Sequence, residues 1–76
     1  DTENLSSTQI EMLKAIADGE QHFSAQVVKQ VYNLGNPNTI VKNKKILQNK
    51  DIIEKQKADF VFIDPIYRLW FQEEYC

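Results

Sequence analysis

Apolar residues near the start of the chain recur with the spacing of an α-helix. The repeat consists of Ile10, Leu13, Ile16 and Ala17. Residues three and four positions apart share one helix face, so these residues predict a buried side. Ser6 with Gln9 three positions later is the pattern of a capping box. Gly19 is a helix stop, so we expect a helix between Ser6 and Gly19. A short strand could follow at Glu20–Phe23, with Phe23 turned inward.

The next segment, residues 24–49, combines apolar stripes with residues that favour helix ends. The first stripe is Val27, Val28, Val31 and Leu34. Ser24 can cap a helix there, and Gly35 can end it in the left-handed conformation. Asn36 is then the cap of a further helix, with Pro37 at the first position, where a missing N–H costs nothing. Two short helices joined by a three-residue turn predict a helix-turn-helix.

The second helix of this pair has an apolar side and a polar side. At about 100° per residue, Ile40 and Leu47 point inward, and Asn43 flanks them, where a buried amide needs partners. The outward residues whose chemistry suits a groove are Asn38, Thr39, Lys42, Lys45, Gln48 and Asn49. Amides pair with adenine and lysines reach guanine or phosphate, so this face fits a DNA major groove. A plain solvated face is the alternative interpretation.

After Asp51 the period changes from that of a helix to that of a strand. Residues 52–56 and 60–63 are rich in β-branched and aromatic side chains. Residues 57–59 between them favour a turn, so the segment predicts a β-hairpin. A hairpin directly after a helix-turn-helix is the wing of a winged-helix domain. We therefore expect an α+β winged helix-turn-helix fold for residues 5–75, with three helices, a hairpin wing and a C-terminal helix.

The charge is unevenly distributed along the chain. The formal net charge is −2, which taken alone argues against a dedicated nucleic-acid binder. Residues 42–57, however, hold six lysines against two acidic residues, whereas residues 1–30 hold five acidic residues against two lysines. Lys55 and Lys57 of this basic block fall in the hairpin and join the candidate DNA-binding residues. A solvated lysine-rich face remains the alternative.

A last helix is predicted after the hairpin, because Asp64-Pro65 repeats the combination of a cap and a proline at the first position. This helix is apolar around much of its girth. Ile66, Leu69 and Trp70 line one side, and Tyr67, Phe71 and Tyr75 line another. One side can close the small core, and clustered exposed aromatics mark an interface. We take Tyr67, Phe71 and Tyr75 as the candidate partner interface; the alternative is that both sides pack under the hairpin.

Composition limits the chemistry that this chain can perform. Its 76 residues make one domain with a small core, and 42% of them are hydrophobic, as in a globular protein. His22 and Cys76 are the only residues of their types and Gly19 and Gly35 are the only glycines, which excludes a zinc cluster and a phosphate-binding glycine loop, and we expect no Cys-His pair. We expect no catalytic residue, no metal site and no cofactor in this chain, no membrane partner, and a cytoplasmic location.

Several short motifs together resemble a known family. They are Leu5-Ser6-Ser7-Thr8-Gln9-Ile10, the corner Gly35-Asn36-Pro37, Lys50-Asp51-Ile52-Ile53, and the run from Phe60 through Asp64-Pro65 to Trp70. Over residues 5 to about 75 the chain resembles the C-terminal winged helix of archaeal-type AAA+ ATPases, a family also found in bacteria. The resemblance implies that the chain is part of a longer protein whose preceding P-loop domain binds and hydrolyses ATP with Mg²⁺. It lends no nucleotide-binding residue to any position here, and the acidic charge departs from that of many DNA-binding winged helices.

Two functions follow as expectations. The first is non-catalytic DNA binding through the third helix and the wing of the fold. The second is protein interaction, in which the domain docks on its own ATPase domain or on another partner. Residues 1–4 are expected to be a frayed terminus or linker.

Overall fold

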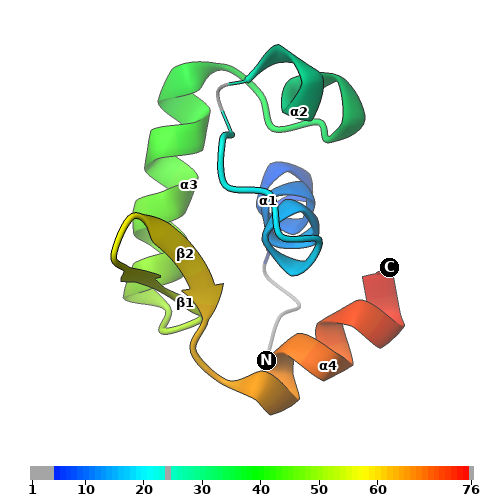
Figure 1. The fold of residues 1–76 in the computed structure, drawn as a ribbon, viewed down its shortest axis with the longest axis vertical. Helices are drawn as coiled ribbons and strands as arrows, with labels where there is room; N and C mark the ends of the chain where they lie inside the picture. Colours follow the sequence, from blue (N-terminus) through cyan, green and yellow to red (C-terminus); the bar gives the residue numbers. More distant parts are fainter. Residues whose placement is uncertain (1–4, 24, 76) are drawn as a thin grey trace.

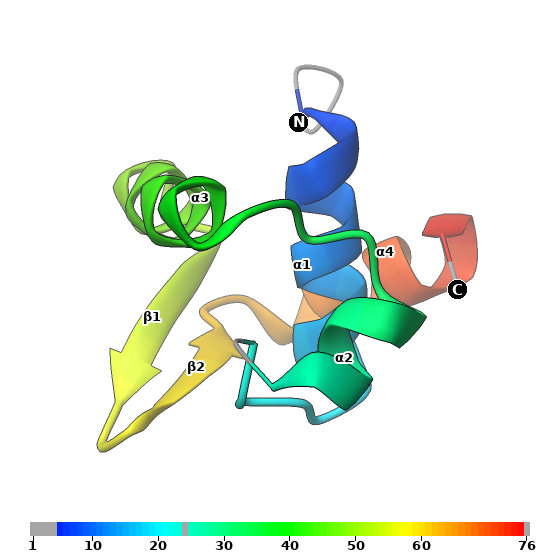
Figure 2. The same cartoon turned by 90° about the horizontal axis from the view of Figure 1, so that it is seen from above.

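The computed structural model describes residues 5–23 and 25–75. Its elements are α1 (Ser7–Ala17), α2 (Gln26–Val31), α3 (Pro37–Asn49), β1 (Ile53–Gln56), β2 (Asp59–Phe62) and α4 (Pro65–Tyr75). α1 lies in the middle, with α3 and the hairpin on one side and α4 on the other (Figures 1 and 2). This order confirms the predicted α+β class. The expected linker at 1–4, the expected cap Ser24 and the terminal Cys76 lie outside the described residues.

Both predicted ends of α1 are confirmed. The Ser6 side chain accepts a hydrogen bond from the Gln9 N–H, and the Gln9 side chain accepts one from the Ser6 N–H at 3.0 Å, which completes the capping box. Gly19 takes a φ of 87°, and the Glu20 N–H donates to the Ala15 carbonyl at 2.9 Å. That bond belongs to a Schellman motif, which satisfies the last carbonyls of the helix.

The stripe predicted for α2 is confirmed for Val28 and Leu34, which are buried, but it is wrong for Val27 and Val31 and for the end of the helix. Val27 and Val31 are exposed to 71% and 67%, whereas Val28 is buried. The helix ends at Val31 because Tyr32 takes an extended backbone (ψ 135°). The buried Tyr32 ring and its hydroxyl, which donates to the Asp18 carboxylate, hold the chain away from a further helical turn.

The connection between α2 and α3 is consequently longer than the predicted three-residue turn. It runs from Tyr32 to Asn36, and Gly35 has the expected left-handed conformation (φ 84°) but lies beyond the end of α2. The start of α3 is as predicted: the Asn36 side chain accepts a hydrogen bond from the Thr39 N–H at 2.8 Å, and Pro37 is the first helical residue.

α3 ends in a Schellman motif that contains no glycine. Asp51 takes a φ of 58°, and the Ile52 N–H donates to the Leu47 carbonyl at 3.1 Å. This turn sends the chain directly into β1. β1 and β2 then pair antiparallel, with Ile53 opposite Phe62 and Lys55 opposite Phe60. The hairpin is as predicted, apart from shifts of one residue at its ends.

The predicted strand at Glu20–Phe23 does not form, although Phe23 is buried as expected. The core combines residues of every element except β2, together with the connections. It consists of Met12, Leu13, Ala15, Ile16, Phe23, Val28, Tyr32, Leu34, Ile40, Leu47, Ile52, Ile53 and Phe71. The inward orientation predicted for Ile40 and Leu47 is confirmed, since both are 2% exposed or less.

The two sides of α4 are the reverse of the predicted arrangement. Phe71 is fully buried, and Tyr67 and Tyr75 are half-buried and pack against the core. Their burial follows from contact with β2, because the Phe62 ring lies 6.0 Å from both the Tyr67 and the Phe71 ring. The prediction that these three aromatics form a free interface is therefore wrong.

Candidate nucleic-acid interface

The outer face of α3 carries the residues that sequence predicted for it. Asn38, Lys42, Lys45 and Asn49 are exposed, and Thr39 and Gln48 are half-buried at the margins. Their spacing of three and four residues places them on one side of the helix. Val41 is exposed beside them, to 55%. The structure thus brings the six predicted α3 residues together on a single solvent-facing surface.

Hydrogen bonds from Asn43 fix the orientation of this helix against α1. The Asn43 Oδ1 accepts from the Gln9 side chain at 3.2 Å, and the Asn43 Nδ2 donates to the Thr8 hydroxyl at 2.9 Å. Because Asn43 is 4% exposed, these partners satisfy an amide that would otherwise be costly to bury. The contact determines which residues of α3 face the solvent.

The wing carries the two remaining candidates. Lys55 and Lys57 are both exposed, and Lys57 occupies the tip of the hairpin with a φ of 57°. Side chains two residues apart share one face of a strand, so Lys55 projects from the face that also carries the buried Ile53. Its cross-strand neighbour on that face is Phe60.

Lys44 is a residue of this surface that sequence analysis did not include among the candidates. Its ammonium lies 5.2 Å from the centre of the Phe23 ring and 5.3 Å from that of Phe60. Both distances are within the range of a cation–π contact. Lys44 of α3 and Lys55 of β1 thus both lie next to Phe60, at the junction of the helix and the wing. The ring contacts come from residues distant in sequence, so no local pattern could have identified them.

One side chain from the connection between α1 and α2 binds the wing at Phe60, one residue pair from the turn of the hairpin. The Gln21 Oε1 accepts from the Phe60 N–H at 2.8 Å, and the Gln21 Nε2 donates to the Phe60 carbonyl at 3.1 Å. The predicted strand is absent here, and a side chain makes the two hydrogen bonds that a strand backbone would make.

Acidic residues interrupt the basic surface but do not neutralise its lysines by direct pairing. Asp51, Glu54 and Asp59 are exposed in the same part of the fold. Glu54 accepts a hydrogen bond from the Gln56 side chain at 2.7 Å. Within residues 5–23 and 25–75 the ion pair that forms is between Lys14 and Glu11 of α1. The candidate lysines therefore keep their ammonium groups available to solvent and to anions.

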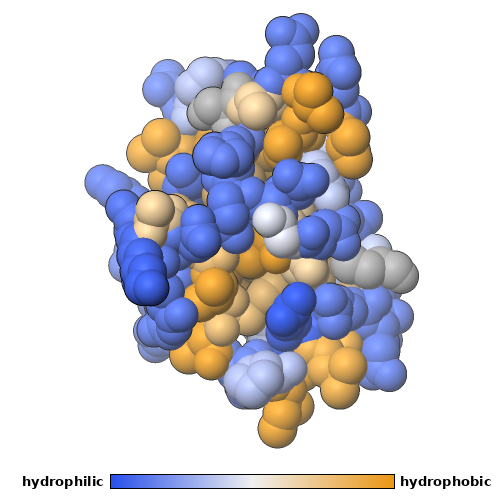
Figure 3. Space-filling model, in the orientation of Figure 1, coloured by the Kyte–Doolittle hydropathy of each residue, from blue (hydrophilic) through white to orange (hydrophobic). Residues whose placement is uncertain are grey.

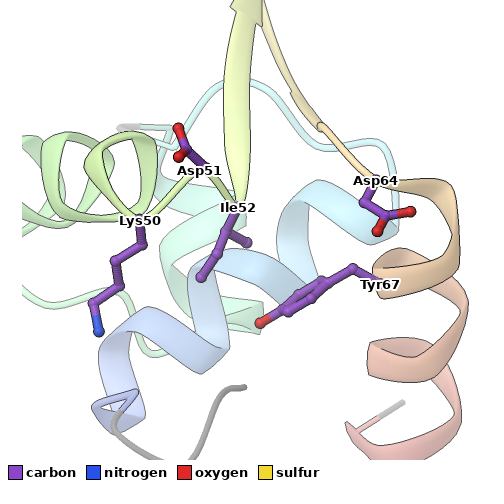
Figure 4. Close-up of a pocket in the computed structure, with 5 residues that line it drawn as sticks. All are labelled: Lys50, Asp51, Ile52, Asp64 and Tyr67. Carbon is purple, nitrogen blue, oxygen red and sulfur yellow. The ribbon is translucent and has the colours of Figure 1, made fainter.

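A pocket of about 340 Å³ lies between the start of the hairpin and α4. It is lined by Lys50, Asp51, Ile52, Asp64 and Tyr67. The Asp51 and Asp64 carboxylates lie on opposite sides of the pocket, and the Lys50 ammonium extends away from both (Figure 4). No three His, Cys, Asp or Glu side chains among the described residues could hold a metal ion together.

The outer side of α4 forms a second candidate surface. Ile66, Leu69 and Trp70 are exposed to 76%, 59% and 39%, and Ile63 just before the helix is exposed to 41%. Figure 3 shows apolar surface over α4 at the lower right. The Trp70 ring is held between those of Tyr67 (5.7 Å) and Tyr75 (6.1 Å). We call Ile63, Ile66, Leu69 and Trp70 the outer α4 face.

Comparison with known families is decisive for the classification. The family model described as a probable winged helix domain matches residues 2–73. The chain belongs to this family. The winged helix domain accordingly has α2 and α3 as its helix pair and β1 and β2 as its wing. Searches among curated proteins and among solved structures gave no match.

The winged helix domain contains no helix, in the part that the structure describes, that is long and apolar enough to cross a membrane. The family match adds no site residues of its own. The interface is therefore defined by the geometry of α3, the wing and their junction.

Proposed function

We propose that this winged helix domain binds double-stranded DNA without catalysing a reaction, through α3 and the wing. The observation that carries the proposal is the arrangement of lysines. Lys42 and Lys45 project from α3, Lys55 and Lys57 project from the hairpin, and Lys44 lies between the two elements. Winged helix domains place their second helix of the pair in the major groove, which supports the assignment of α3 as the reading element.

The lysines and the amides of this surface would have different roles, since lysines provide affinity for DNA and amides can read its sequence. Lysines neutralise phosphates and position the protein without reading sequence. The amides Asn38, Gln48 and Asn49 on the same helix can pair with adenine edges. Because the domain has a net charge of −2, long-range attraction to DNA is weak, and binding depends on these local contacts.

The experiment is fluorescence anisotropy with a mixed-sequence duplex, starting at about 50 mM salt. With about three to five neutralised phosphates, the slope of log affinity against log salt should be near −3 to −4.5. Lys42→Glu combined with Lys45→Glu should abolish binding and leave the melting temperature nearly unchanged, because both side chains are exposed. The matched control is Lys29→Glu, a lysine of α2 outside the candidate surface. No binding by the wild type at low salt would refute the proposal.

The resemblance to AAA+ ATPases extends the proposal to the longer protein. In this view the domain follows a P-loop domain that uses ATP and Mg²⁺, and the winged helix itself supplies no cofactor-binding residue. Titration of the isolated domain with ATP–Mg²⁺ should leave its amide NMR shifts unchanged. Localised, saturable shifts at micromolar ATP would contradict this assignment.

A second candidate function is protein docking, which the outer α4 face favours. Ile66, Leu69 and Trp70 are exposed at positions three and four residues apart on α4, and the Trp70 ring is held by two neighbouring rings. Rigid aromatic anchors are typical centres of protein interfaces. The occupant that we propose is the ATPase domain implied by the resemblance. Leu69→Gln should then weaken docking of the two domains and leave DNA binding unchanged, since α4 lies across α1 from α3 (Figure 2).

A further inference from the structure

A single glutamine outside the candidate DNA-binding residues holds the wing in place. We propose that Gln21 is a positioning residue for DNA binding, which fixes the wing lysines relative to α3. This inference rests on the proposed function and deepens it. It assigns a role to the segment between α1 and α2, which contains none of the candidate DNA-binding residues.

The hydrogen-bond pattern of the hairpin shows why Gln21 is suited to this role. The Ile63 N–H donates to the Ile52 carbonyl, and bonded and non-bonded pairs alternate along an antiparallel ladder. The pair of Lys55 with Phe60 is therefore non-bonded, and the Phe60 N–H and carbonyl point away from β1. Gln21 satisfies both groups, at 2.8 and 3.1 Å.

A two-stranded hairpin needs such support, because two strands alone are at best marginally stable in water. The sheet here has two strands, β1 and β2. At Phe60, the β2 residue opposite Lys55, Gln21 makes the two hydrogen bonds that a third strand would make. The ring of the same residue is contacted by α3, since the Lys44 ammonium lies over the Phe60 ring.

Phe60 thus attaches the wing both to the connection between α1 and α2 and to α3. Its backbone is bound by Gln21, and its ring is covered by Lys44. Loss of the Gln21 bonds would leave the hairpin attached mainly through its ends and its apolar face. The lysines of the wing would then sample a wider range of positions, and binding would have to restrict them at an entropic cost.

The test uses Gln21→Met, which keeps the length and much of the volume of the side chain and removes both hydrogen bonds. Gln72→Met on α4 is the matched control. The first measurement is hydrogen exchange of the Phe60 amide in the free domain. Loss of two hydrogen bonds should accelerate local exchange by about 5- to 100-fold, whereas the control should leave it unchanged.

The second measurement is a double-mutant cycle in DNA affinity, with Lys55→Gln and Lys57→Gln introduced together. In the wild-type background these changes should weaken binding and reduce the salt slope by about 1.8, for two phosphate contacts. We expect Gln21→Met alone to weaken binding by about threefold or more, through lost preorganisation. In the Gln21→Met background, the two lysine substitutions should weaken DNA binding less than they do in the wild type, because the contacts of the wing lysines with DNA are already impaired.

The outcomes separate this inference from the proposed function. If wild type binds no duplex, the proposed function fails and the inference fails with it. If wild type binds, and Gln21→Met leaves either Phe60 exchange or DNA affinity unchanged, only the inference is overturned. Additive effects in the cycle would also overturn it, since a purely structural role would weaken binding independently of the wing lysines.

Discussion

The side chain of Gln9 donates a hydrogen bond to the Oδ1 of Asn43 across 3.2 Å, and this bond joins the start of α1 to the middle of α3. Gln9 serves two purposes at once, since its Oε1 also accepts the Ser6 N–H of the capping box. The helix cap and the packing of the candidate reading helix therefore depend on the same buried amide.

Asn43→Ala should destabilise the domain by about 1–3 kcal/mol, because the buried Gln9 amide loses its acceptor. The Thr8 hydroxyl loses a donor in the same substitution. Asn49→Ala on the exposed face of α3 is the control and should stay within about 0.5 kcal/mol. Chemical denaturation of both variants provides the comparison, and equal effects would contradict the role assigned to Asn43.

The phase of α2 can be tested with two adjacent valines. Val28→Ala should cost about 1.5–3 kcal/mol, because it removes buried methyl groups from the core. Val27→Ala should be neutral or stabilise by up to about 0.7 kcal/mol, since Val27 is exposed and alanine has the higher helix propensity. Thermal melts of the two variants would reveal a phase error if Val27→Ala proved the more damaging.

The two glycines should differ in their tolerance of alanine. Gly19→Ala should cost about 1–2 kcal/mol from its positive φ alone, since a Cβ there would meet no atom within 4 Å. Gly35→Ala should cost more, because the new Cβ would lie 3.1 Å from the Thr39 Cγ2. Urea unfolding measures both changes. In a Thr39→Ser background, which lacks that methyl group, the excess cost at Gly35 should shrink.

The orientation of α4 gives a fourth prediction. Phe71→Ala should cost about 3–5 kcal/mol, because the ring is fully buried. Leu69→Gln on the outer α4 face should change the stability by no more than about 0.5 kcal/mol. Differential scanning calorimetry distinguishes the two. A large loss for Leu69→Gln together with a small one for Phe71→Ala would restore the arrangement that the sequence predicted.

The elements that could be predicted from sequence are those whose signals are local. The capping box of Ser6 with Gln9 and the pair Asn36-Pro37 lie within a few residues of the helix starts that they fix. The end of α2 depends instead on a contact between Tyr32 and Asp18, which are distant in the chain. Periodicity alone could not show that Tyr32 leaves the helix.

The difference between local signals and contacts between elements also explains why the exposed face of α3 was predicted correctly and the buried side of α4 was not. The outward residues of α3 follow from helical geometry and from one apolar line, so their common face was predictable. In α4 both sides are apolar, and the choice of the buried side depends on the Phe62 ring of β2. Gln21 and Lys44 were missed because their partner Phe60 lies on another element.

The left-handed conformation of Lys57 at the tip of the wing implies a conflict between folding and charge. Glycine or asparagine would occupy this position with less strain, yet either would remove an ammonium group from the part of the hairpin farthest from the core. A collection of variants selected only for stability should therefore lose the tip cation, whereas one selected for duplex binding should keep it. Comparing the residues recovered at position 57 in the two selections would reveal whether the domain retains an imperfect turn for the sake of its ligand.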